Sequence, residues 1–141
     1  MLNIHPYLVH FPIALFPLAF IFDILSLSRR ATFLAKPGWV IQCVGTGMLI
    51  LTVVSGLVAR SLAVVPPGAI ESFDMHQQLA FVSAGLLLGL FFWKLASRGE
   101  TPQRAKLLYS IVQAVAVCVL LATSWQGGEL VYTFGVGIGP R

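Results

Sequence analysis

Three histidines are the side chains of this sequence best suited to bind a metal ion or a cofactor. His5 and His10 lie at the start of an apolar run in the stretch NIHPYLVHFPIALF, and His76 opens a second apolar run. Imidazole nitrogens are common ligands of haem iron, copper and zinc. Two histidines on different helices, at similar depth, could face each other across a flat cofactor. What they can bind depends on the elements that carry them.

The composition indicates that these elements lie in lipid. Of the 141 residues, 57% are hydrophobic and only 10% are charged, and the mean hydropathy is +0.88. A soluble domain is roughly 25% charged, and a soluble fold of this length could not bury so much apolar surface. The net charge of +4 comes mostly from two short basic links, so it indicates membrane topology and not a nucleic-acid partner. The expected partner is the lipid bilayer.

Four apolar stretches are long enough to cross a bilayer as helices, which takes roughly 20 residues each. Short links between them favour an up-down-up-down bundle. We therefore predict an all-α integral membrane protein in which residues 1–141 form a single four-helix transmembrane domain. The predicted spans cover about residues 7–28, 39–64, 75–96 and 105–125, and residues 126–141, rich in glycine, are expected to form an extended tail over the outer face.

The basic residues predict how the bundle is oriented. Most of them lie in or beside the first and third links, and cytoplasmic links carry an excess of Lys and Arg. Both termini are therefore expected outside, which is the periplasmic side of a bacterial inner membrane. The residues that give this orientation are Arg29, Arg30, Lys36, Lys94, Arg98, Arg104 and Lys106, against Arg60 and Arg141 on the opposite side.

With this orientation all three histidines lie at the outer end of the bundle. His10 is several residues inside the first span and His76 opens the third, so we predict that these two form the ligand pair. His5 precedes the first span and is a reserve ligand or a contact to a haem propionate. Arg60, near the outer end of the second span, would lie at propionate level, although extension of its side chain to the headgroups explains it equally well.

Other polar residues have expected places as well. Asp23 lies about 20 Å deeper than His10 at 1.5 Å per helical residue, and Lys94 lies at a comparable depth, so an ion pair between them is expected. In the tail, the adjacent Gly127 and Gly128 would let the backbone approach a ligand closely, and Glu129 adds an acid at the same end.

Several motifs resemble a bacterial membrane family called domain of unknown function 2231. They are HPYLVHFPIAL at the start, GLVAR late in the second span, the histidine that opens the third span, and GGELVYTFGVG near the end. The resemblance covers essentially the whole chain. Relatives are sometimes joined to Rieske or cytochrome-like domains, which implies electron transfer with haem b. The family motifs fall on His5, His10, His76, Gly127, Gly128, Glu129, Tyr132 and Gly135.

The leading functional hypothesis is a small membrane haem-b protein or subunit that transfers electrons, with His10 and His76 as axial ligands. Its electrons would pass to a quinone or to another membrane redox protein. One alternative is a copper or zinc site made by the histidines with Met75. Another is a non-catalytic subunit of a larger respiratory or photosynthetic complex. We find no nucleophile–base pair, phosphate loop or carboxylate pair in the sequence, so independent catalysis is not expected.

Overall fold

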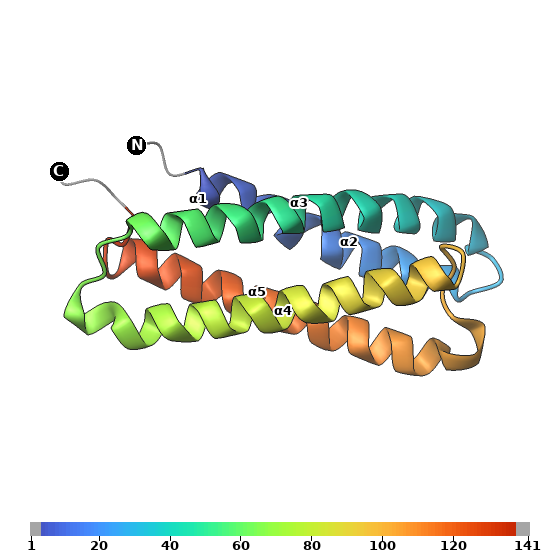
Figure 1. The fold of residues 1–141 in the computed structure, drawn as a ribbon. Helices are drawn as coiled ribbons and strands as arrows, with labels where there is room; N and C mark the ends of the chain where they lie inside the picture. The colour runs from blue at the N-terminus through green and yellow to red at the C-terminus, as the bar shows by residue number, and fades with distance from the viewer. Residues whose placement is uncertain (1–3, 138–141) are drawn as a thin grey trace.

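The computed structural model describes residues 4–137, and every regular element in that part of the chain is helical. Four long helices run antiparallel along one another, and a short helix precedes them (Figure 1). They are α1 (His5–Leu8), α2 (His10–Ser26), α3 (Ala35–Leu62), α4 (Ile70–Ala96) and α5 (Lys106–Tyr132), with the short 3-10 helices η1 (Thr32–Leu34), η2 (Pro67–Ala69) and η3 (Gln103–Ala105) in the links.

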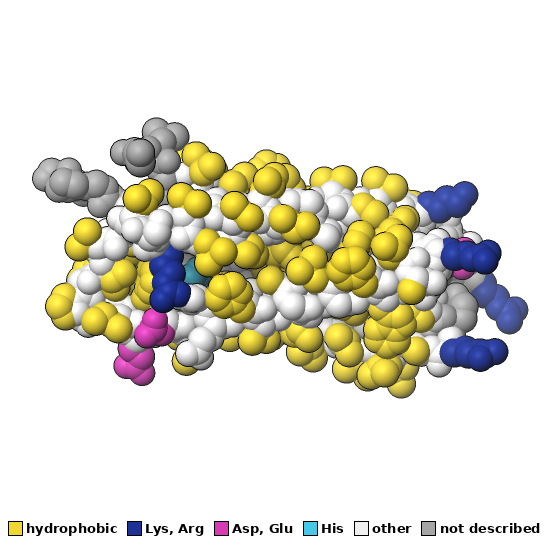
Figure 2. All heavy atoms as spheres, in the orientation of Figure 1, with side chains coloured by type: hydrophobic (Ala, Val, Ile, Leu, Met, Phe, Trp, Pro, Cys, Tyr) yellow, Lys and Arg dark blue, Asp and Glu magenta, His cyan; other side chains and the backbone are white. Residues whose placement is uncertain are grey.

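The four long helical segments confirm the predicted membrane bundle. Each is long and apolar enough to cross a bilayer, and large hydrophobic side chains cover the outside of the bundle (Figure 2). Such an outside surface is what lipid tails require. The segments are His5–Ser26, Thr32–Leu62, Pro67–Ala96 and Lys106–Tyr132.

The two ends of the bundle differ in charge. Lys and Arg side chains gather at one end, beyond the links that follow α2 and α4 (Figures 1 and 2). The beginning of α1 and the end of α5 lie together at the opposite end (Figure 1). We call these the basic end and the terminal end. The positive-inside rule predicts that the basic end faces the cytoplasm.

The bundle is organised as two helical hairpins that pack against each other. In the first hairpin α2 packs along α3, and in the second α4 packs along α5. Leucines and aromatic rings fill the space between the hairpins, including Tyr109, which has no exposed surface and meets Trp93 edge-on with ring centroids 5.6 Å apart. The buried core consists of Phe16, Leu49, Ala84, Leu87, Leu90, Tyr109, Ala116, Val117 and Leu120.

The last helix continues further than the sequence predicts. An extended tail is expected from residue 126, but α5 runs through Gly127 and Gly128 and ends at Tyr132. Glycine is tolerated in membrane helices because no water competes for the backbone hydrogen bonds. Gly135 instead ends the helix, because its φ of +67° lets the amide of Val136 reach the carbonyl oxygen of Leu130 at 2.9 Å.

Candidate functional site

His5 is fixed to the side of α3 by its ring nitrogen Nδ1. This atom lies 3.1 Å from the carbonyl oxygen of Thr52 and 3.0 Å from Oγ of Ser55. The ring also lies over Gly56, so closely that a Cβ at Gly56 would be 2.9 Å from Cε1 of the imidazole. Glycine at this position uncovers the Thr52 carbonyl, which is one helical turn earlier, and lets the imidazole reach it.

His76 is fixed to α5 in the same way. Its Nδ1 lies 3.0 Å from the carbonyl oxygen of Thr123. A Cβ at Gly127, four residues further along α5, would be 3.0 Å from Cε1 of the ring. Each histidine is therefore held by a threonine carbonyl and a glycine on the facing helix, and the threonine follows the histidine by 47 positions in both cases.

The hydrogen bonds decide which ring nitrogen carries the proton. A backbone carbonyl can only accept, so Nδ1 of His76 must donate to Thr123, and the carbonyl of Thr52 requires the same of His5. In a neutral imidazole Nε2 then carries the lone pair. A histidine held through Nδ1 by a carbonyl, with Nε2 as the ligand atom, is the usual arrangement at metal centres.

A break in the first membrane segment determines where the side chain of His5 lies. Pro12 has no amide hydrogen to donate to the carbonyl of Leu8, and α1 and α2 are separated at Val9. The hydroxyl of Thr52 lies 3.2 Å from that carbonyl oxygen and 2.8 Å from the carbonyl oxygen of Met48 in its own helix, so its single hydrogen is shared between the two, and α3 partly replaces the hydrogen bond that the proline cannot make. The short helix α1 is thereby attached to α3, and His5 in its first turn reaches Ser55 and Thr52.

The pair that the structure brings together is His5 and His76, not His10 and His76. His5 and His76 are both half-buried, and they are close enough for a charge on one to act on the other. Figure 2 shows a histidine in a recess near the terminal end, between hydrophobic side chains and beside a basic one. His10 has an exposed side chain on the outside of α2. The starts of the first and third spans lie at the same end of the bundle (Figure 1), but α2 packs along α3 and α5 and not along α4, and the break at Val9 gives His5 the inward position.

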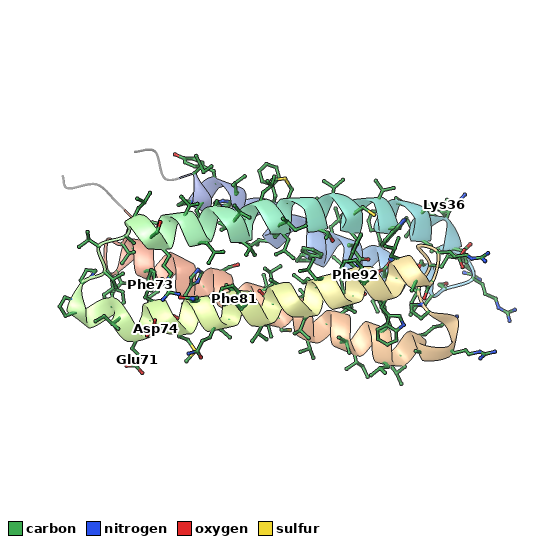
Figure 3. All side chains as sticks on the ribbon, in the orientation of Figure 1. Lys36, Glu71, Phe73, Asp74, Phe81 and Phe92 are labelled. Atoms are coloured by element: carbon green, nitrogen blue, oxygen red, sulfur yellow. The ribbon has the colours of Figure 1, made fainter. Side chains whose placement is uncertain are left out.

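The basic residue expected at the site is tied to the histidine-bearing helix. Arg60 is exposed, and its guanidinium donates to Oε1 of Gln77, the residue after His76. Two acids are nearby but outside the bundle: Glu71 and Asp74 point away from α4 near the terminal end (Figure 3).

The predicted tail residues differ in how closely they lie to His76. Gly127 touches the ring of His76, whereas the nearest side-chain atom to a Cβ at Gly128 belongs to Tyr132 at 4.0 Å. Glu129 is half-buried and Tyr132 is fully on the outside, 90% exposed. Met75 is exposed as well. Within residues 4–137 no group of three His, Cys, Asp or Glu side chains is placed to hold a metal ion.

A second polar cluster lies deeper in the bundle, toward the basic end. Lys94 Nζ is 2.5 Å from Oδ1 of Asp23, and Gln113 Nε2 donates to the other carboxylate oxygen at 3.0 Å. Asp23 is 2% and Lys94 0% exposed. The predicted ion pair is confirmed, and the carboxylate has donors on both oxygens, as a charge buried within a membrane needs.

The family of predicted membrane proteins called DUF2231 matches residues 1–140. The chain belongs to this family. No curated protein and no solved structure matches the chain. The resemblance predicted from the end motifs is thus confirmed, and this DUF2231 protein is a membrane protein whose family description gives no reaction.

Sequence reasoning predicted Gly127 as a site residue but missed Thr52, Thr123 and Gly56 as partners of the histidines. Thr52 and Gly56 look like ordinary small residues of a membrane helix, which is how they are read when α3 is considered alone. The signal that could have found them is a repeated spacing: His, then Thr 47 residues later, then Gly one turn further, occurs from His5 and again from His76.

Proposed function

We propose that this DUF2231 protein is a small membrane haem-b protein that transfers electrons, and that His5 and His76 would hold the haem iron. The observation that carries the proposal is the matching attachment of the two imidazoles. Each is held through Nδ1 by a threonine carbonyl on the facing helix. In this tautomer each imidazole would bind iron through Nε2.

Two imidazole nitrogens are a donor set that haem iron can use. Haem iron accepts two axial imidazoles, and a hydrogen bond to the ring nitrogen that does not bind iron fixes the orientation of the ligand. Haem bound there would take up and release one electron. His5 and His76 would hold it from opposite hairpins, and Arg60, fixed beside His76 through Gln77, is the basic residue available to a propionate.

The surroundings support a role in the membrane and not in solution. Both imidazoles belong to helices that can cross a bilayer, near the end of the bundle that carries few basic residues. If the basic end faces the cytoplasm of a bacterial inner membrane, this site is near the outer surface. There it would exchange electrons with a quinone or with a membrane redox partner, alone or as a subunit of a larger complex.

The test is an absorption spectrum of the protein purified from cells supplied with haem. We expect a Soret band and a reducible α-band, lost in His5→Ala and in His76→Ala. His10→Ala is the matched control, because it removes an exposed imidazole from the same segment, and its spectrum should not change. A full spectrum in His5→Ala together with loss in His10→Ala would restore the pair predicted from the sequence. Absence of both bands from the unaltered protein would rule out haem.

A copper ion is the second candidate, and the number of ligands favours it over zinc. Structural and catalytic zinc sites use three or four protein ligands, and residues 4–137 place no three such side chains together. Two imidazole nitrogens alone can hold Cu(I). Metal analysis of the same purified sample separates the cases: one copper per chain without a Soret band supports copper, and haem iron supports the first proposal.

A further inference from the structure

The two hairpins carry corresponding residues at one constant separation. Asp23 and Lys94, which form the buried ion pair, are 71 residues apart. The same separation relates His5 to His76 and relates their threonine and glycine partners. It also relates Gln42 to Gln113, the two glutamines buried within the helices, and the short helix η1 to η3.

The buried residues of the two hairpins are also related by a separation of 71 residues. The buried residues of α2 are Pro12, Phe16, Ala19 and Asp23. Their counterparts in α4, Ser83, Leu87, Leu90 and Lys94, are buried too. All five buried residues of α3, from Gly38 to Leu49, likewise have buried counterparts in α5, from Tyr109 to Leu120.

Helical periodicity alone would also bury many counterparts at separations three, four or seven residues away, and at 72 residues Pro12 and Gly45 would still correspond to the buried Ala84 and Val117. At 71 residues all nine buried residues of α2 and α3 have buried counterparts. A single separation matches the buried faces of both helix pairs, the linking helices and the histidine attachments. It therefore relates two hairpins that share their buried positions and linking helices, differ in sequence, and differ in the break at Val9, which α4 lacks.

We propose that the chain is made of two copies of one helical-hairpin unit, residues 5–62 and 76–132, and that Asp23 and Lys94 determine which unit pairs with which. The two residues occupy the same position in the two units and carry opposite charges. When a first unit meets a second unit, the carboxylate and the ammonium neutralise each other at 2.5 Å. The proposal is independent of what the histidines bind.

The alternative pairings are excluded by charge. Two first units from different chains would bring carboxylate against carboxylate, and two second units would bring ammonium against ammonium. Uncompensated like charges in a membrane interior are expensive. Opposite charges at one equivalent position thus favour closure of the bundle by two unlike units, in the way that a single buried polar residue sets partner choice in a coiled coil.

The experiment exchanges the charges. We expect Asp23→Lys and Lys94→Asp each to abolish recovery of a monodisperse folded protein in detergent. We expect the double variant D23K/K94D to recover it, with a melting temperature close to that of the unaltered protein. In the double variant Gln42 takes the place of Gln113 as donor to the carboxylate. Gln113→Leu should therefore destabilise the unaltered protein, and Gln42→Leu should destabilise the exchanged one.

The matched control exchanges two buried residues that touch but are not equivalent. Gln42 and Tyr109 are hydrogen-bonded at 3.4 Å and stand 67 residues apart, so the double variant Q42Y/Y109Q should not recover the fold. Failure of D23K/K94D to recover would show that the two positions are not equivalent and would overturn the proposal. Normal folding of either single variant would overturn it as well, because the pair would then not determine the pairing.

Discussion

The imidazole of His76 lies against Gly127 of α5, where a Cβ would be 3.0 Å from its Cε1 atom. Adding a methyl group there must push the ring away from the carbonyl oxygen of Thr123. We expect Gly127→Ala to weaken the hydrogen bond at Nδ1, seen as loss of a slowly exchanging His76 Nδ1–H signal by NMR. In the haem-loaded protein it should also perturb the Soret band.

Gly128→Ala is the control for this substitution. The two glycines are adjacent on α5, and a Cβ at Gly128 meets an ordinary contact 4.0 Å away. Alanine is favoured over glycine within a helix by about 0.8–1 kcal/mol, so Gly128→Ala should leave the His76 signal unchanged and stabilise the protein slightly. Equal effects of the two substitutions on the His76 signal would contradict the close contact.

The hydroxyl of Thr52 links α3 to α1, because it lies within hydrogen-bond distance of the Leu8 carbonyl oxygen. Pro12 leaves this carbonyl without a helical partner. Thr52→Val keeps the side-chain shape and removes this donor. We expect a loss of about 1 kcal/mol in stability and faster hydrogen exchange in α1. Thr123→Val is the comparison, because both hydroxyls donate within their own helices at 2.8 Å, and of the two it is the Thr52 hydroxyl that also lies 3.2 Å from the carbonyl oxygen of Leu8. If both variants exchange alike in α1, the attachment is not made by Thr52.

The unit-pairing proposal makes a prediction for two different chains in one membrane. Chains carrying Asp23→Lys and chains carrying Lys94→Asp should rescue each other when they are produced together. By exchanging hairpins they form a heterodimer in which each bundle again has one carboxylate opposite one ammonium. Two affinity tags should co-purify a dimer of two unlike chains, while each variant alone gives aggregated protein. Recovery of separate monomers, or of no protein, would contradict the prediction.

The excess of basic side chains at one end predicts the orientation of the bundle. Alkaline phosphatase fused after the last residue should be active, and a green fluorescent protein fused there should be dark, because the terminal end would lie outside the cytoplasm. Insertion of the same reporters in the link between α4 and α5 should give the opposite pattern. The reversed result at both positions would place the histidine pair on the cytoplasmic side.

Hydropathy and the helical rise predicted most of the fold, because the number of spans, and the depth of a residue within its span, follow from the length and composition of the apolar runs. They located four spans, and the comparable depth of Asp23 and Lys94 correctly predicted their ion pair. They could not tell which way a side chain faces near an irregular turn. His10 lies deeper than His5 along the chain, but the break at Val9 turns His5 inward and leaves His10 outside. The extent of α5 was mispredicted because Gly127 and Gly128, within the apolar span, do not end the helix, whereas Gly135, beyond it, does.

The ion pair between Asp23 and Lys94 also has an electrical consequence. A single charge moved across a membrane gains or loses about 2.3 kcal/mol per 100 mV of membrane potential. The two buried charges sum to zero and lie 2.5 Å apart, a small fraction of the roughly 30 Å apolar thickness of a bilayer. The membrane potential therefore does almost no work on them, and energising the membrane leaves the contact between the two hairpins undisturbed.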